Sequence, residues 1–574
     1  MEALDWLVIG VFFLALIGII VWVVRQKQND SADYFLGGRD ATWLAIGASI
    51  FASNIGSEHL IGLAGAGASS GMAMAHWEIQ GWMILILGWV FVPFYTRSMV
   101  YTMPEFLERR YNPQSRTILS VISLVSYVLT KVAVTVYAGG LVFQQVFGIK
   151  ELWGIDFFWI AAIGLVVLTA LYTIFGGMKS VLYTSVLQTP ILLLGSLIIL
   201  VLGFKELIIL VLGFKELGGW DEMMRVCGAV TVNDYGDTMT NLIRSNDDAN
   251  FPWLGALIGS AIIGFWYWCT DQFIVQRVLS GKNEMEARRG TIFGAYLKLL
   301  PVFLFLIPGM IAFALHQKYI GAGGEGFLPM LANGTANADA AFPTLVAKLL
   351  PAGVKGLVVC GILAALMSSL ASLFNSSAML FTIDFYKRFR PETPEKKLVG
   401  IGQVATVVIV ILGILWIPIM RSVGDVLYTY LQDVQSVLAP GIAAAFLLGI
   451  CWKRTSAQGG MWGLIAGMVI GLTRLGAKVY YSNAGEVADS TFKYLFYDMN
   501  WLFFCGWMFL FCIIVVIVVS LATEAPTAEK IQGLVFGTAT KEQKAATRAS
   551  WNHWDIIHTV IILAITAAFY WYFW

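Results

Sequence analysis

Charged residues are scarce in this chain, and their scarcity excludes most classes of soluble protein. Lys, Arg, Asp and Glu make up 13% of the 574 residues, whereas hydrophobic residues make up 58%. The net charge of +1 also excludes a chain-wide nucleic-acid binder, because such proteins carry a large basic surplus. Long apolar runs along the whole sequence predict an all-α polytopic membrane protein.

Cysteine is scarce as well, and enzyme motifs are missing. The six cysteines form no C-x-x-C pair, so we expect neither a disulfide framework nor a metal knuckle. The sequence contains no H-E-x-x-H, no Walker A motif and no G-x-S-x-G after a strand. We therefore expect that the protein is not an enzyme.

Apolar runs of about 20 residues predict membrane-spanning helices, and 14 such spans in a single transmembrane domain are expected. The first run lacks the basic start and the small-residue cleavage site of a signal peptide, so we expect it to be retained. The predicted spans are residues 5–24, 43–69, 77–98, 117–147, 156–174, 179–203, 253–279, 290–315, 341–382, 398–419, 423–450, 456–479, 500–521 and 551–573.

The distribution of basic residues among the loops predicts the topology. The loops with the most Lys and Arg are 25–27, 108–116, 282–289, 387–397, 453–454 and 530–548. The positive-inside rule places these loops in the cytoplasm. An even number of spans then places both termini outside the cell membrane, together with the long polar loops 218–252 and 316–340.

A tandem copy occurs at the end of the sixth predicted span, where residues 197–206 and 207–216 both read LIILVLGFKE. Solenoid repeats have periods of about 20 to 50 residues, so this copy does not indicate a repeat fold. A sequence slip or a recent duplication explains it, and we expect function not to depend on the second copy.

Ionisable side chains inside the predicted spans are the first candidates for a binding site. Each costs about 2.5–3.5 kcal/mol at the middle of a membrane helix, so each needs a partner or a function. Each of these residues, taken singly, could belong to a buried ion pair. Because they recur at similar depth in spans that are not adjacent in sequence, a common binding site is favoured. They are Glu58, His59, Glu78, Lys131, Asp271, Lys298 and Asp433.

The stretch 43–71 is apolar but carries Asn54, Glu58 and His59 beside glycine at its middle, which predicts a helix that breaks around a bound solute. The aromatic run 265–268 cannot lie on one helical face, because each residue turns by about 100°. Some of these rings therefore point inward, where they can stack on a sugar. An aromatic belt at the membrane interface is the alternative.

Hydroxyl groups in the predicted span 341–382 suit a sodium ion. Ser368, Ser369 and Ser372 are close in sequence, and hydroxyls combined with carbonyls freed at a helix break form a neutral oxygen cage. Serines that only bond the preceding helical turn are the alternative.

A set of short motifs carries a family resemblance over nearly the whole chain. The motifs are DYFLGGR at 33–39, IGAS at 46–49, ASNIGSEH at 52–59, YTMPEF at 101–106, WYWCTDQ at 266–272, QR at 276–277, YLK at 296–298, MSSL at 367–370 and FLLGICWKR at 446–454. They resemble the sodium/glucose cotransporters of the sodium:solute symporter family. The resemblance implies a LeuT-type core of two inverted five-helix repeats with broken helices, at 43–203 and 253–450, with peripheral helices at 5–24 and 456–573.

The resemblance also implies the site residues. The solute would contact Asn54, His59, Glu78, Tyr267, Trp268, Lys298 and Gln432, with Tyr267 as an inner gate stacked on the ring. Sodium would bind the carbonyls of Ala52, Ile55 and Ala365 and the hydroxyls of Ser368 and Ser369.

Two departures from the family pattern limit these expectations. Members that couple two sodium ions resemble each other in an aspartate where this chain has Ser185 and a threonine where it has Ala371, so we expect one sodium per sugar. A bacterial galactose-type member has an asparagine where this chain has Gly264 and a glutamine where it has His59. The pocket is therefore expected to be closer to the mammalian glucose type.

The resemblance implies sodium-coupled symport of a neutral hexose, glucose or galactose, by alternating access in a lipid bilayer. The alternatives are another solute on the same scaffold, such as myo-inositol, another polyol, sialic acid or an amino acid, or a sugar sensor that passes current without uptake. An anionic solute should require an arginine, but the cations at mid-span are only lysines and His59. This composition favours a neutral solute.

Overall fold

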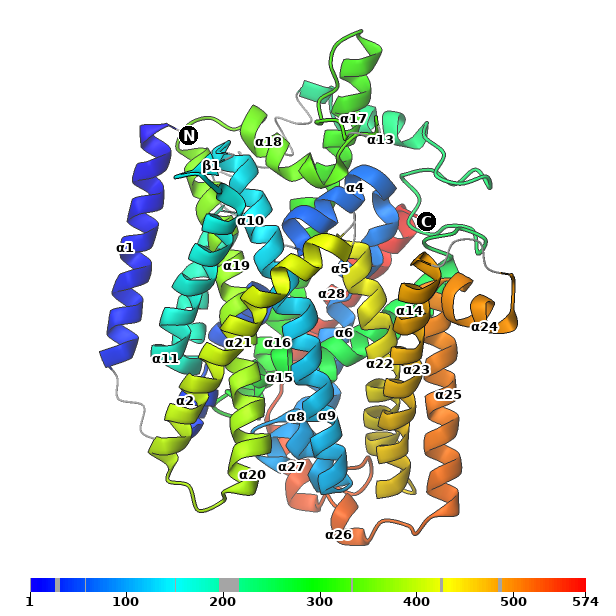
Figure 1. The fold of residues 1–574 in the computed structure, drawn as a ribbon. Helices are drawn as coiled ribbons and strands as arrows, with labels where there is room; N and C mark the ends of the chain where they lie inside the picture. Colours follow the sequence, from blue (N-terminus) through cyan, green and yellow to red (C-terminus); the bar gives the residue numbers. More distant parts are fainter. Residues whose placement is uncertain are drawn as a thin grey trace.

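The computed structural model describes residues 2–25, 31–56, 58–149, 151–195, 216–331, 334–423, 427–483 and 488–574. The described part is a bundle of helices (Figure 1), and its one sheet is an antiparallel hairpin of β1 (Glu151–Leu152) and β2 (Ile155–Asp156). Nearly all of the tandem copy at 197–216 lies outside the described residues.

The first half of the chain forms helices of very different length. They are α1 (Ala3–Arg25), α2 (Ser31–Leu36), α3 (Trp43–Asn54), α4 (Ala64–Ser70), α5 (Ala75–Glu78), α6 (Gly81–Ile86), α7 (Val92–Ser98), α8 (Met103–Arg110), α9 (Pro113–Ser126), α10 (Ala133–Phe147) and α11 (Phe157–Gly195). Single π-helical turns, Leu87–Phe91 and Tyr127–Val132, connect α6 to α7 and α9 to α10 without a loop.

The second half contains the longest buried helices. Its helices are α13 (Trp220–Gly228), α14 (Trp253–Gly264), α15 (Gln272–Leu279), α16 (Glu284–Lys298), α17 (Ile307–Gly321), α18 (Ala341–Leu349), α19 (Val354–Met379), α20 (Lys387–Phe389), α21 (Glu395–Val423), α22 (Leu427–Cys451), α23 (Ala457–Asn483), α24 (Thr491–Lys493), α25 (Trp501–Ala522), α26 (Ala528–Ile531), α27 (Lys541–Ala549) and α28 (His553–Tyr572).

Among the described residues, 11 helical segments are long and apolar enough to cross a membrane. The structure is therefore the expected all-α polytopic membrane protein, while the number of 14 spans stays a prediction. One predicted span, 341–382, is divided: α18 ends at Leu349 and α19 starts at Val354.

Two helices are interrupted near their middle. The main chain leaves the helix at Ile55 (φ −75°, ψ 109°) and resumes as a π-helical turn at Glu58–Leu63, which confirms the break expected in 43–71. A second break lies at Asp271 (φ −77°, ψ 128°), between the π-helical turn Phe265–Thr270 and α15. The sequence predicts one uninterrupted span at 253–279, and this break divides it.

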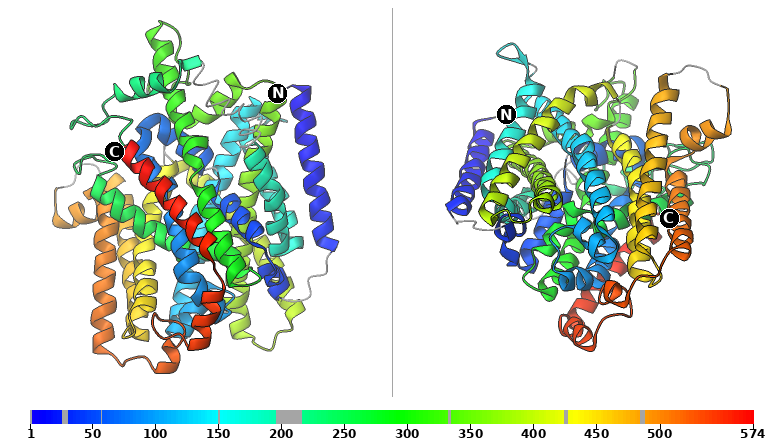
Figure 2. Two further views of the ribbon diagram at one scale, coloured as in Figure 1. Left: turned by 180° about the vertical axis from the view of Figure 1, so that it is seen from behind. Right: turned by 60° about the horizontal axis from the view of Figure 1, so that its bottom comes forward.

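Burial increases from the edge of the bundle to its centre. In the most apolar stretch of the segment that contains α19, 94% of the residues are buried. The corresponding shares for α1 and α28 are 22% and 17%. In Figure 2 α1 lies at one edge and α28 crosses the back of the bundle. The assignment of residues to two inverted repeats stays a prediction.

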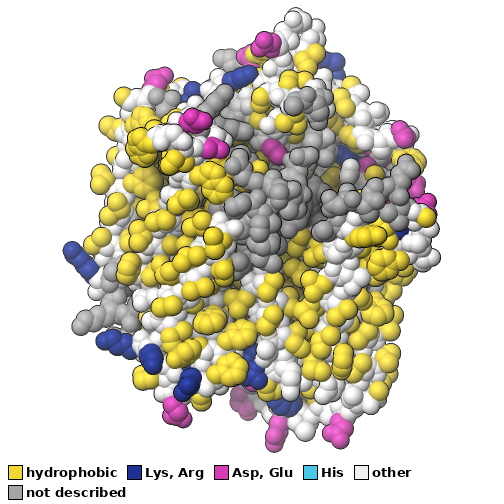
Figure 3. All heavy atoms as spheres, viewed as in Figure 1, with side chains coloured by type: hydrophobic (Ala, Val, Ile, Leu, Met, Phe, Trp, Pro, Cys, Tyr) yellow, Lys and Arg dark blue, Asp and Glu magenta, His cyan; other side chains and the backbone are white. Residues whose placement is uncertain are grey.

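The two ends of the molecule differ in charge. Both termini lie in the upper half of Figure 1, at the end that carries α13 and α18, whereas α20, α26 and α27 lie at the opposite end. Hydrophobic side chains cover the middle of the face drawn in Figure 3, and several Lys and Arg side chains line its lower end. The predicted cytoplasmic loops 108–116, 387–397 and 530–548 adjoin α8, α20 and α27, which lie at this end (Figure 1).

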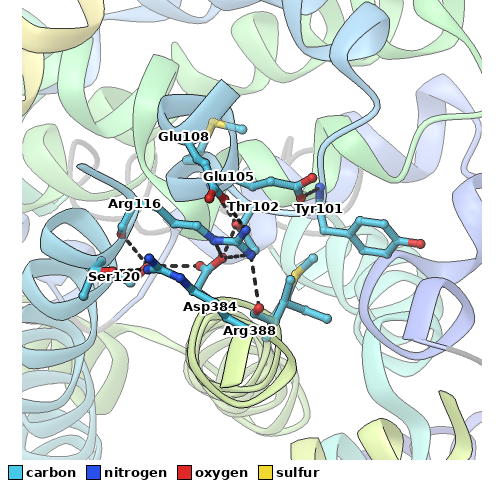
Figure 4. A network of polar contacts seen from close by, with 12 residues as sticks. Tyr101, Thr102, Glu105, Glu108, Arg116, Ser120, Asp384 and Arg388 are labelled. Carbon is cyan, nitrogen blue, oxygen red and sulfur yellow. Dashed lines mark hydrogen bonds and ion pairs between the residues drawn. The ribbon is translucent and has the colours of Figure 1, made fainter. Parts of the chain in front are cut away.

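At this lower end a buried carboxylate connects three elements (Figure 4). Asp384 follows α19 and accepts hydrogen bonds from the Thr102 hydroxyl (2.9 Å) and the Arg116 guanidinium (2.7 Å). Arg116 also pairs with Glu108. These contacts hold α8 and α9 against the end of the most buried helix.

Candidate functional site

One cavity is lined by residues from both broken helices, and all seven predicted solute-binding residues line it. The cavity is small, with a volume of about 70 Å³, below the range of about 300–1,000 Å³ that is usual for small-molecule sites. Its lining consists of Asn54, Glu58, His59, Trp77, Glu78, Gln80, Lys131, Thr135, Ile263, Gly264, Tyr267, Trp268, Phe273, Lys298, Ser369, Leu373, Gln432 and Gln435. The structure thus brings the predicted residues together, while their roles stay predictions.

Glu78 and Lys298 form the charged centre of the cavity. Lys298 Nζ lies 2.7 Å from Glu78 Oε2 and donates a second hydrogen bond to Asn54 Oδ1 at 3.1 Å. His59 Nε2 lies 3.4 Å from the same Glu78 oxygen. All four side chains are buried, so each polar group needs the others or a solute as partner.

Aromatic rings border this charged centre. Asn54 Nδ2 donates to the Tyr267 hydroxyl at 3.3 Å, and the Lys298 ammonium lies 5.4 Å from the centre of the Trp268 ring. Tyr267 and Trp268 pack edge to face, 4.9 Å apart. The rings of the run 265–268 therefore point partly into the cavity, as the sequence pattern predicted.

A second ion pair lies at the unforeseen helix break. Lys131 Nζ lies 2.6 Å from Asp271 Oδ2, and the Tyr127 hydroxyl donates to the other carboxylate oxygen. The Lys131 ammonium also lies 4.6 Å from the centres of the Tyr267 and Phe273 rings. For Lys131 and Asp271, the structure therefore confirms the alternative interpretation of the sequence, which is a buried ion pair.

Two of the five predicted sodium ligands, Ser369 and Ile55, contact each other at the first helix break. The Ser369 hydroxyl lies within hydrogen-bond distance of the carbonyls of Ser53 (3.0 Å) and Ile55 (3.1 Å). α19 is unbroken here, so the Ala365 carbonyl is also an acceptor within its own helix and offers only its second lone pair. The carbonyls of Ser53 and Ile55 are instead available to Ser369 because the helix ends at Asn54.

The other residues of the predicted ion site are buried around this point. Ala52, Ala365 and Ser368 are all nearly inaccessible, and Ala371 is buried on α19. The side chains of Ser185 and Asp433 lie outside the described residues.

Several lining residues were not assigned a role from the sequence. These include Gln80, Thr135 and Gln435. Their side chains are uncharged, so the free-energy cost of placing them inside a membrane is lower and does not by itself indicate a binding site. Glu58 is one of the ionisable candidates for the site, but the family resemblance gives it no contact with the solute.

Comparisons with known proteins identify the family of this chain. The sequence model of the sodium:solute symporter family matches residues 34–467. Sodium/myo-inositol cotransporter 2 of Mus musculus is 37% identical over 552 residues, which cover 94% of this chain and 80% of the relative. Sodium/glucose cotransporter 4 of Danio rerio is 36% identical over 548 residues, which cover 92% of this chain and 80% of the relative.

Solved structures show the same fold. A Na⁺-coupled sialic acid symporter in a substrate-bound outward-open state has a TM-score of 0.71 and covers 92% of this chain and 99% of its own, at 21% identity. MhsT in complex with L-phenylalanine has a TM-score of 0.50 at 12% identity. At these identities the likeness concerns the fold alone.

Proposed function

Because the chain belongs to the sodium:solute symporter family and performs sodium-coupled transport of a solute, we propose that its solute is a neutral polyhydroxyl compound, a hexose such as glucose or galactose. The single observation that carries this proposal is the charge-balanced cluster of Glu78, Lys298, Asn54 and His59 in the cavity. The carboxylate accepts hydrogen bonds from hydroxyl groups, and the ammonium donates to hydroxyl oxygens.

The charges of the cavity disfavour an anionic solute. Lys298 is paired with Glu78 and Lys131 with Asp271, so neither lysine offers an unbalanced positive charge. Glu58 adds a further carboxylate to the lining. An anionic solute such as sialic acid would find no unpaired lysine among the described residues of this cavity. Burying its charge without a partner would cost a large desolvation free energy.

A second candidate solute is myo-inositol, and the sequence relatives favour it. Relatives at 36–37% identity are sodium/myo-inositol cotransporters. Both hexoses and myo-inositol are rings that carry several hydroxyl groups, so the same cluster of donors and acceptors suits either. Sites that bond each hydroxyl discriminate strongly against analogues that lack one.

We assign sodium to the point where Ser369 meets the carbonyl of Ile55, with Ala52, Ala365 and Ser368 completing the set. Sodium bound there stabilises the break in α3 and so favours the state that accepts solute. One charge that moves through 100 mV contributes about 2.3 kcal/mol, enough for a gradient of about fifty-fold. The proposed stoichiometry is one ion per solute, because Ser185 lacks the carboxylate and Ala371 the hydroxyl found at these positions in members that couple two sodium ions.

Uptake into proteoliposomes tests the solute and the coupling. With an inward sodium gradient, labelled glucose, galactose or myo-inositol should accumulate above its outside concentration, with one charge moved per molecule. Uptake that is equally fast when potassium replaces sodium contradicts the proposal. Current evoked by solute without accumulation would indicate a sensor.

A paired substitution on α19 tests the ion site. Ser368→Ala combined with Ser369→Ala should raise the sodium concentration needed for half-maximal uptake at least tenfold. Ser377→Ala is the matched control, because the buried Ser377 hydroxyl on the same helix has no hydrogen-bond partner among the described residues. Unchanged sodium dependence in the double variant would contradict the assignment.

A further inference from the structure

Gln80 reaches the cavity because the chain is locally unwound. Ile79 (φ −82°, ψ 20°) and Gln80 (φ −79°, ψ 23°) separate α5 from α6. In a regular helix, residues two positions apart face different directions, yet Glu78 and Gln80 both line the same cavity. Gln80 is only 3% exposed, so its amide is buried there.

The orientation of this amide is fixed by one contact. Gln80 Nε2 donates to the main-chain carbonyl of Ser260 at 2.9 Å. A carbonyl only accepts hydrogen bonds, so the amide nitrogen and not the oxygen must face Ser260. The opposite atom, Oε1, is thereby turned away from Ser260, and no donor among the described residues reaches it.

Gly264 leaves the space that this oxygen occupies. A Cβ atom at position 264 would lie 2.5 Å from Gln80 Oε1 and 3.0 Å from Gln80 Cδ. Any side chain there would push the amide aside, because real Cβ atoms do not approach other atoms so closely. Glycine therefore leaves room for the Gln80 amide at the cavity wall, which Glu78 and Lys298 also line.

We propose that Gln80 is a solute-binding residue whose Oε1 accepts a hydrogen bond from one hydroxyl group of the solute. The inference rests on the proposed transport of a neutral polyhydroxyl solute. The Ser260 carbonyl holds the amide nitrogen, so the amide oxygen of this cavity-lining residue is the atom that can accept a hydrogen bond from a solute hydroxyl. The pair Gln80 and Gly264 then sets which hydroxyl, and which stereoisomer, fits this part of the wall.

Deoxy analogues identify the hydroxyl. Gln80→Met keeps the length of the side chain but removes the acceptor. At saturating sodium we expect this variant to raise the KM for the transported solute (glucose, galactose or myo-inositol) at least tenfold. For the one mono-deoxy analogue that lacks the partner hydroxyl, wild type and variant should differ by less than twofold. The sodium dependence should not change.

Two further variants keep the test decisive. Gln403→Met is the matched control, because Gln403 also donates its amide to a main-chain carbonyl, that of Ile174 at 3.1 Å, but does not line the cavity. It should leave every KM unchanged. Gly264→Ala displaces Oε1 without altering Gln80 and should reproduce the deoxy-selective pattern, even where Gln80→Met does not fold.

The outcomes separate this inference from the proposed function. If wild-type protein shows no sodium-driven uptake of any of the three solutes, the proposed function and this inference both fail. If wild-type uptake is normal but both variants raise the KM equally for the parent solute and for every deoxy analogue, Gln80 is only structural. An unchanged KM for the parent solute in both variants overturns the inference as well.

Discussion

At the scale of single residues, Lys298 connects the carboxylate of Glu78 with the amide of Asn54. Lys298→Met removes this connection but keeps most of the side-chain volume. Hydrogen bonds to charged groups contribute about 1.5–3 kcal/mol, and about 1.4 kcal/mol corresponds to a tenfold change in affinity. We therefore expect the KM for the solute to rise at least tenfold, measured as initial uptake at saturating sodium.

The matched control for this lysine is Lys348→Met. Lys348 donates to the main-chain carbonyl of Phe327 at 2.8 Å and does not line the cavity. Its replacement should leave the KM for the solute unchanged. A Lys298→Met protein with wild-type KM would show that the ammonium does not contact the solute.

The ion pair of Lys131 and Asp271 supports a second prediction at this scale. Both side chains are buried, and the loss of one member of a buried pair costs about 3–5 kcal/mol because the other charge is left alone. Asp271→Asn and Lys131→Met should each lower the melting temperature of the purified protein, while the double variant should melt above either single variant. Additive losses in the double variant would contradict a direct pair.

At the scale of elements, the sequence predicted one helix break and missed the other. Asn54 and Glu58 lie beside glycine in an apolar run, and such polar groups need an irregular backbone or a ligand inside a membrane. Asp271 follows an aromatic run and has neither glycine nor proline next to it. Only its residue type indicates a break, because aspartate is a preferred residue at the start of a helix. Asp271 does cap α15 by accepting a hydrogen bond from the Phe273 amide.

The contacts within the site were less predictable than its members. Lys131 and Asp271 are 140 positions apart, and Lys298 and Glu78 are 220 positions apart. No local pattern of residues specifies such pairs, because helix packing brings them together. Gln80 was missed for a different reason: an uncharged amide carries no strong cost that demands an explanation.

Close packing of α4 against α17 depends on glycine and gives a prediction for this pair of helices. A Cβ atom at Gly309 would collide with the main-chain carbonyl of Ala64, and one at Gly67 with that of Leu306. Gly309→Ala should therefore force the helices apart and destabilise the protein by about 1–3 kcal/mol. Thermal unfolding in detergent measures the loss.

Gly321→Ala is the control on the same helix. Nothing lies within 4 Å of a Cβ atom built at Gly321. A substitution at such an open site should change stability by no more than about 0.5 kcal/mol. Equal destabilisation by both substitutions would mean that the contact with α4 does not explain the effect, since alanine has a higher helix propensity than glycine.

At the scale of the whole molecule, the separation of charge between the two ends predicts the orientation in the cell membrane. The basic loops share the end that carries α27, and the positive-inside rule places that end in the cytoplasm. Cysteines introduced at exposed positions test this. Tyr235 lies in the long polar loop after α13, and Lys544 lies on α27. In intact cells, a membrane-impermeant maleimide should label Tyr235→Cys.

Lys544→Cys should react only after the cells are made permeable. Both variants need Cys451→Ser as background, because Cys451 is exposed whereas the other five cysteines are buried. The same orientation places both termini outside, since they lie toward the end opposite α27 (Figure 1). Labelling of Lys544→Cys, and not of Tyr235→Cys, in intact cells would reverse the orientation. An inward sodium gradient would then draw solute into the protein from the end that carries α27.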